Sequence, residues 1–359
     1  MFSTVLIFLV ILVLLILSHE FGHFLLAKWY GVKVEEFGFG LPPRLFGLKR
    51  GETLYSLNLL PVGGFVRIEG EEAEDGMALS PRSFASKSIF ARALIIGAGV
   101  FFNLLLAWIL FSAVGWYGAP TALDDNNPLS NAYVVVAEVA INSPAALSGL
   151  SAGDTISRLS YDGESLEVSK VKEVQDFVAR HAGQDIAITY LRGGKPFTVQ
   201  AKPRSVINEK EGRLGIAMMR IGVRSVPWYS ALWEGLKNTI TMTGATAVGI
   251  ASFIYGLIFG AMGLDGVAGP VGIVNIVSGA VNFGWAYVVQ LIAILSINLA
   301  VINIIPFPGL DGGRLFFLGV EALRGKPVDA KTSSWAHTIG LILLLIFMFI
   351  ITYHDIARL

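Results

Sequence analysis

Cysteine is absent from this chain of 359 residues, and charged side chains are scarce. Without cysteine the chain forms no disulfide and no thiolate metal site, although this does not fix its compartment. Only 15% of the residues are charged, against roughly 25% in a soluble domain, and 54% are hydrophobic. The 27 basic and 27 acidic residues cancel, so nothing favours nucleic acid as a partner. This composition predicts an integral membrane protein.

The apolar run Phe2–Leu17 lacks the basic region and the small-residue cleavage site of a signal peptide. We therefore expect it to be retained as a transmembrane helix. A spanning helix needs about 20 mostly apolar residues, and four stretches qualify, at about 2–27, 92–117, 284–305 and 337–353. The sequence predicts a polytopic α-helical membrane protein with about four transmembrane helices.

The segments between these helices differ in character. Val32–Phe39 and Thr53–Ile68 alternate between apolar and polar side chains and are punctuated by Gly and Pro, which predicts short strands or hairpins. Glu69–Asp75 is an acidic, solvated tether. A fifth apolar stretch, about 246–264, is rich in Gly, Ala and Ser. Before it, Trp228–Thr243 has one apolar face, which favours a helix along the outer membrane surface or a plain linker helix.

A soluble region between the second and fifth apolar stretches has the pattern of a small α+β domain. The pattern comprises strands near Val134–Val139, 155–159, 185–191 and 197–201, a helix start at Ser143-Pro144-Ala145, turns at Gly149-Leu150 and Gly153-Asp154, and an amphipathic helix at 171–181. This order resembles the permuted PDZ domain of bacterial proteases, in a single copy. We accordingly divide the chain at 1–27, 28–91, 92–117, 120–205 (the PDZ-like domain), 206–283, 284–311, 312–336 and 337–353.

The positive-inside rule orients the helices. Lys and Arg gather near the helix ends in two loops, 28–91 and 312–336, which we therefore expect in the cytoplasm. The PDZ-like domain then faces outward, because long domains translocate largely regardless of their own charge.

His19-Glu20-Phe21-Gly22-His23 is an H-E-x-x-H motif at the end of the first apolar run. On a helix the two histidines lie on one face, where they can share one zinc ion. Zinc lowers the pKa of a bound water to about 7, and Glu20 can act as general base. Ionisable residues are costly in lipid, so the motif indicates a functional cavity. The alternative is a helix end that simply lies among the headgroups.

A catalytic zinc site needs a third protein ligand, and Asp311 is the best candidate. It follows an apolar helix that ends in Pro306 and Pro308. Irregular backbone at membrane depth is tolerated only where it is buried or lines a cavity. For a lone Asp-Gly, an ordinary turn is the alternative.

The pairing of these ligands constrains the topology. The two histidines lie at the cytoplasmic end of the first span and Asp311 at the carboxyl end of 284–305, so these helices must run parallel. Parallel helices need one full span between them, which is 92–117. We therefore expect 246–264 not to cross the membrane but to pack at its outer surface or to re-enter.

The chain resembles the site-2 proteases over nearly its whole length, and most closely the bacterial regulator-of-sigma-E protease group. The motifs that carry the resemblance are His19-Glu20-x-x-His23, Leu60-Pro61-x-Gly63-Gly64, the PDZ-like segment, Gly269-Pro270-Val271-Gly272-Ile273, and Ser296-Ile297-Asn298 leading to Leu310-Asp311-Gly312. The resemblance implies zinc held by His19, His23 and Asp311, with Glu20 as general base.

The resemblance also implies a substrate site. Asn298 and Asn303 line it and hold the substrate or the oxyanion, although hydrogen bonds between helices in lipid explain both equally well. The loop after the first helix forms a re-entrant β-sheet whose edge, with Gly63 and Gly64, binds an extended substrate by strand addition. A plain cytoplasmic hairpin is the alternative. The family's second helix has a Gly-Pro-x-x-Asn-like pattern, whereas Gly99–Asn103 lacks the Pro, which leaves the role of Asn103 open.

The expected enzyme is a zinc metalloendopeptidase of the bacterial inner membrane, with its active site near the cytoplasmic side. Its partners are the lipid bilayer and a single-span membrane protein already trimmed by another protease, such as an anti-sigma factor or a signal-peptide remnant. Two alternatives are a non-catalytic membrane scaffold that works through its PDZ-like domain and a metal transporter. The complete ligand set with Glu20 argues against the first, and the lack of repeated halves argues against the second.

Overall fold

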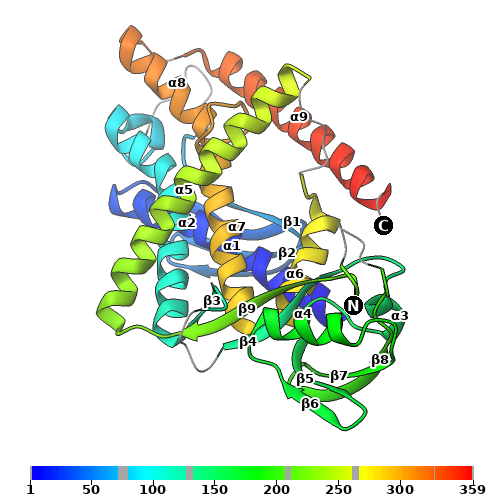
Figure 1. The fold of residues 1–359 in the computed structure, drawn as a ribbon. Coiled ribbons are helices and arrows are strands. Elements are labelled where there is room, and N and C mark those ends of the chain that lie inside the picture. The colour runs from blue at the N-terminus through cyan, green and yellow to red at the C-terminus, as the bar shows by residue number, and fades with distance from the viewer. Residues whose placement is uncertain are drawn as a thin grey trace. The chain divides into compact units, whose positions relative to one another are not determined.

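The computed structural model describes residues 2–71, 80–126, 132–206, 212–260, 267–326 and 328–357. Two compact units form, each from several stretches of chain (Figure 1). The helical unit comprises Met1–Ser112, Leu232–Asn275 and Leu291–Leu359, and the sheet unit comprises Ala113–Ala231 and Ile276–Gln290. The part of the acidic tether at 72–75 and the end of the fifth apolar stretch at 261–264 lie outside the described residues.

Five helices in the described chain are long and apolar enough to cross a membrane. At most 39% of the most apolar window of each is buried, so most of these side chains face the surroundings. Such a surface is stable in lipid rather than in water, which fits a multi-pass membrane protein. The five are α1 (Phe2–Trp29), α2 (Ile89–Tyr117), α5 (Trp228–Ile258), α7 (Trp285–Ile304) and α9 (Ala330–Ala357), while α6 (Pro270–Phe283), α8 (Asp311–Arg324) and the 3-10 turn η1 (Phe84–Ser86) are shorter.

The helices α1 and α7 run in the same direction, as the expected metal ligands require. Along α1, Ser18 donates to the carbonyl of Phe102, and further on His23 contacts the carbonyl of Ile95, so α1 is antiparallel to α2. Near the middle of α7, Ala293 packs in one buried cluster with Ala107 of α2, and Ser296 donates to the carbonyl of Asn103. Later in α7, Asn303 reaches the ligand end of α1, so α7 is also antiparallel to α2.

The structure joins two segments that the sequence analysis treats separately, Trp228–Thr243 and the apolar stretch that starts at 246, while the expectation that 246–264 does not cross the membrane stays a prediction. Residues Trp228–Ile258 form one continuous helix instead of a surface helix and a separate segment. At its start Trp108 donates to the carbonyl of Leu232, and further on Thr246 donates to Asn298 of α7. Helix α5 therefore runs beside α7 in the same direction. Between them in the chain lies α6, whose 14 residues are fewer than a span requires and so escape a search by length.

The loop after α1 folds into a sheet of β1 (Val34–Arg50) and β2 (Thr53–Ile68). Both expected strands are confirmed, and β1 extends well beyond its expected end. Glu36–Phe39 pairs with Leu54–Leu57 on one side and with Gly64–Arg67 on the other. In the described part of the chain the last of these segments is paired along one edge only, so its second edge is free.

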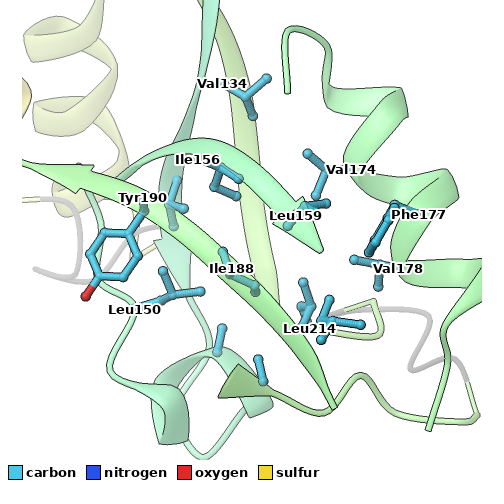
Figure 2. Packing of buried hydrophobic residues seen from close by; sticks show 14 residues of the cluster. Val134, Leu150, Ile156, Leu159, Val174, Phe177, Val178, Ile188, Tyr190 and Leu214 are labelled. Atoms are coloured by element: carbon cyan, nitrogen blue, oxygen red, sulfur yellow. The ribbon is translucent and has the colours of Figure 1, made fainter. Parts of the chain in front are cut away.

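Seven strands form the sheet of the sheet unit, in the order β3-β9-β4-β5-β7-β8, with β6 paired to β5. In β7 every second side chain, Ile186, Ile188 and Tyr190, is buried, which is the period of a strand with one face on a core. Figure 2 shows Val174 and Phe177 of α4 packed over that face. The elements are β3 (Ala119–Leu123), β4 (Ala132–Val139), α3 (Pro144–Ser148), β5 (Thr155–Tyr161), β6 (Glu164–Glu167), α4 (Val171–Arg180), β7 (Ile186–Arg192), β8 (Lys195–Ala201) and β9 (Ile216–Arg224).

The sheet extends past the carboxyl boundary that the sequence predicts for this domain. β9 lies in the range assigned to a linker, yet it pairs with β3 on one side and β4 on the other. The bulge in this pairing lies in β4, between Val136 and Glu138. In β9 itself Arg220, Ile221 and Gly222 are buried in succession, so its burial does not alternate and the pattern of residues does not reveal the strand.

Candidate active site

Three ionisable side chains from distant parts of the chain meet in the helical unit. His19 and His23 lie on one face of α1, and Asp311 is the first residue of α8. Asp311 Oδ2 is 3.1 Å from His19 Nε2 and 3.3 Å from His23 Nε2, and the two Nε2 atoms are 3.2 Å apart. Two imidazoles and a carboxylate are a donor set of catalytic zinc sites, which keep a fourth position open.

The surroundings of the three ligand atoms fit a metal ion. Asp311 Oδ2 is buried and makes no hydrogen bond of good geometry within the described part of the chain. His23 Nδ1 lies 2.9 Å from the carbonyl oxygen of Ile95. A carbonyl only accepts, so His23 carries its proton on Nδ1, and Nε2 keeps its lone pair for a metal.

Two glycines bring α1 and α2 close enough to house the imidazoles. A Cβ at Gly22 would collide with the backbone of Ala98. A Cβ at Gly99 would lie 2.6 Å from Cε1 and 2.8 Å from Nδ1 of His19, and it would also collide with His23. Small residues allow this kind of close helix packing in membranes, and here the space left by glycine is filled by the two rings.

The position of Asp311 is fixed by the chain on both sides of it. Before it, Gly309 has a φ of +98°, and a Cβ there would lie 2.9 Å from the backbone nitrogen of Leu341 in α9. After it, Glu321 of α8 pairs with Arg92 of α2 through two contacts of 2.5 and 3.2 Å. This ion pair therefore joins α8 to α2, the helix that packs against the two histidines.

Glu20 lines a cavity of about 830 Å³ together with the three expected ligands. The free-edge segment Gly64–Ile68 forms another part of the cavity wall. Arg314, one turn after Asp311, also lines the cavity and pairs with Glu71. The cavity thus brings a possible general base, a set of metal ligands and an unpaired strand edge together.

The four residues that we expect to bind the substrate lie in different surroundings. Gly64 contacts α1 beside Glu20, and Gly63 takes the left-handed conformation with a φ of +85°. Asn303 Nδ2 lies 3.5 Å from His19 Nε2, at the ligand cluster. Asn298 is turned toward α5 instead, and its Oδ1 accepts a hydrogen bond of 3.4 Å from Thr246.

Asn103, whose role the sequence left open, reaches the cluster. It is fully buried, and its Nδ2 lies 3.3 Å from Nδ1 of His19. The signal was present in the sequence, because a polar residue four positions after Gly99 shares its helix face. The missing Pro of the family pattern obscured it.

Comparisons with known proteins agree with this geometry. The profile of peptidase family M50 matches residues 7–347. The zinc metalloprotease RasP of Shouchella clausii is 30% identical over 441 aligned positions, which cover 99% of each chain. RasP of Geobacillus kaustophilus is 29% identical, with 98% of this chain and 97% of the relative covered. A Bacillus subtilis protein named regulator of sigma-W protease RasP is 29% identical, with 99% of each chain covered.

Proposed function

The chain belongs to peptidase family M50, the site-2 proteases, and from this premise we propose that it hydrolyses peptide bonds within the membrane-spanning segments of single-span proteins. It is a zinc metalloprotease, so a non-catalytic membrane scaffold and a metal transporter no longer explain the H-E-x-x-H motif. The observation that carries the proposal is the meeting of His19, His23 and Asp311 on helices apolar enough for lipid.

In the proposed mechanism the Nε2 atoms of His19 and His23 and the Oδ2 atom of Asp311 would hold the zinc ion. When bound, zinc supplies a Lewis acid that lowers the pKa of water to about 7. Glu20 takes the proton from the attacking water and passes it to the leaving amine. Asn303, which lies next to His19, donates to the oxyanion that forms on the substrate carbonyl.

The substrate has to be extended before it can be cut, because a helix hides its peptide bonds in its own hydrogen bonds. In our proposal the free edge of Gly64–Ile68 binds the unwound segment as an added strand. Gly64 packs beside Glu20, so an added strand runs past the general base. In this proposal the sheet of β1 and β2 is re-entrant, with its exposed apolar side chains, such as Leu45 and Phe46, in lipid.

The proposed substrate class is a membrane protein that another protease has already trimmed. The name of the Bacillus subtilis relative, regulator of sigma-W protease, supports an anti-sigma factor as one such substrate, and signal-peptide remnants are a second class. In this proposal the sheet unit is a PDZ-like domain on the outer side of the bacterial inner membrane, where it excludes untrimmed ectodomains. The edge of β9 that faces away from β4 is already paired with β3. A peptide could therefore add to β9 as a strand only if it displaced β3.

The test is cleavage of a single-span substrate with a shortened ectodomain, in proteoliposomes that contain the full-length protein. Wild type is compared with Glu20→Gln and with Asp311→Ala, and bound zinc is measured in each. We expect cleavage by wild type only, about one zinc per chain in wild type and Glu20→Gln, and little zinc in Asp311→Ala.

Two results would contradict the proposal. Cleavage by Glu20→Gln at the wild-type rate would mean that another group acts as base or that a contaminant cuts. A soluble peptide cut as fast as the membrane substrate, at a bond exposed to water, would make the protein a protease but not an intramembrane one.

A further inference from the structure

The two imidazoles of the cluster are oriented by different kinds of group. Nδ1 of His23 contacts the backbone carbonyl of Ile95, and a substitution of the Ile95 side chain does not remove this carbonyl. Behind His19 stands the side-chain amide of Asn103, at 3.3 Å from Nδ1. The orientation of His19 therefore depends on one replaceable side chain.

The side chain of Asn103 is enclosed by the protein. It has no solvent-exposed surface, and its backbone carbonyl accepts a hydrogen bond of 2.7 Å from Ser296 of α7. Its Nδ2 faces His19, while its Oδ1 is buried without a hydrogen-bond partner among the described residues. A buried acceptor without a partner is costly, so the orientation of the amide has to follow from the chemistry of His19.

The proton that His19 must carry decides how the amide is oriented. For His19 Nε2 to bind a metal it must be unprotonated, so the ring carries its proton on Nδ1, which then donates. Nδ2 of an amide also donates and cannot receive this proton. Turning the amide by about 180° exchanges Oδ1 and Nδ2 in nearly the same space and places the acceptor opposite Nδ1. In the turned amide Oδ1 accepts the Nδ1 proton of His19, and Nδ2 takes the place that Oδ1 had.

We infer that Asn103 is the positioning residue of the metal site: its Oδ1 accepts the Nδ1 proton of His19 and so holds the ring with Nε2 toward the metal. This inference rests on the proposed ligand set. Partners of this kind typically contribute 10–100-fold to metal affinity. Gly99, one turn earlier on α2, leaves the space in which the ring and the amide meet.

The test measures zinc dissociation constants by competition with a chromophoric chelator, on full-length protein in nanodiscs. Asn103→Leu keeps the size of the side chain but has no acceptor, and we expect 10–100-fold weaker binding. Asn103→Asp keeps an acceptor on a side chain of the same shape, and we expect zinc affinity close to that of the wild type, because a carboxylate also accepts the Nδ1 proton of a metal-binding histidine. Ser296→Ala is the matched control, since it removes a hydrogen bond to Asn103 but none to His19.

The outcomes separate this inference from the proposed site. Wild-type zinc affinity in His23→Ala would overturn the ligand set and the inference with it. Loss of zinc in His23→Ala together with wild-type affinity in Asn103→Leu would overturn the inference alone. An equal loss in Asn103→Leu, Asn103→Asp and Ser296→Ala would also overturn it, because that pattern assigns Asn103 to helix packing.

Discussion

Gly64 of β2 lies directly against Glu20 of α1. A Cβ at position 64 would lie 3.0 Å from Cγ of Glu20 and 2.7 Å from Cγ2 of Ile16. Glycine therefore brings the free edge of the sheet next to the side chain that we propose as general base. Through this contact, the strand edge that would bind an extended substrate lies beside the general base that would act in its cleavage.

Gly64→Ala is expected to reduce kcat/KM at least 10-fold while the zinc content stays at the wild-type level. The added methyl group must push the strand edge away from α1, and a misplacement of about 1 Å can cost about 100-fold in rate. Cleavage of the single-span substrate and zinc analysis measure the two quantities.

Gly63→Ala is the control for this variant. Gly63 has a φ of +85° but no described atom within 4 Å of a Cβ there, so alanine causes backbone strain of about 1–2 kcal/mol without a clash. We expect a smaller loss of activity than in Gly64→Ala. Equal rates for Gly64→Ala and wild type would mean that the substrate does not pass between β2 and Glu20.

Gly99→Ala is expected to abolish zinc binding. Its Cβ would lie within 2.8 Å of ring atoms of His19, and the same methyl group would meet His23, so the two imidazoles cannot keep their positions. Gly97→Ala, two residues earlier on the same helix, meets no described atom within 4 Å and should bind zinc like wild type. Metal analysis after dialysis compares the two. Zinc retained by Gly99→Ala would mean that the histidines bind metal in another arrangement.

Much of this architecture follows from the sequence because its signals are local. The H-E-x-x-H spacing on a helix dictates that His19 and His23 share a face, and the apolar runs dictate which helices can lie in lipid. The requirement that Asp311 meets them correctly implies parallel helices α1 and α7. These inferences need only helix geometry and the cost of charge in lipid.

The remaining features depend on contacts between distant segments. Helix α6, which lies between α5 and α7 in the chain, is shorter than a span, so hydropathy did not reveal it. The contact of Asn103 with His19 depends on which residues of α1 and α2 meet, and Gly22 and Gly99 set this through packing. Likewise, the side chain of Asn298 accepts a hydrogen bond from Thr246 and does not reach the ligand cluster. This depends on where α5 packs against α7.

Asp125→Ala is expected to destabilise the first turn of α4 in the sheet unit. The Asp125 carboxylate accepts from the backbone nitrogens of Val171 and Lys172, at 3.0 and 2.8 Å, and so caps the helix from a distant part of the chain. Loss of such a cap typically costs 0.5–2 kcal/mol. Hydrogen exchange at the amides of Val171 and Lys172 measures the effect in the full-length protein.

Asp124→Ala is the matched control for this variant. Asp124 contacts Arg220 through its backbone carbonyl, which alanine retains, so the exchange rates at the start of α4 should stay near wild type. Wild-type exchange at Val171 in Asp125→Ala would mean that solvent caps this helix equally well.

The ion pair of Arg92 and Glu321 is expected to be the charge pair that matters most for the position of α8. Their side chains are only 13% and 15% exposed, and they join α2 to the helix that begins with Asp311. Removing one partner of a buried pair leaves an uncompensated charge and costs about 3–5 kcal/mol, whereas replacing both with apolar residues is often neutral. Glu321→Leu should therefore lower both the stability and the zinc occupancy, and Arg92→Met combined with Glu321→Leu should recover most of both.

The comparison pair is Lys33 and Glu69, whose side chains are 38% and 24% exposed. Solvent screens such a pair, so Glu69→Gln should change the stability much less than Glu321→Leu and leave the zinc occupancy unchanged. Thermal unfolding and metal analysis of the three variants and the wild type give the answer. If Glu321→Leu keeps its zinc, then the turn around Gly309 alone positions Asp311, and the ion pair contributes to stability without shaping the metal site.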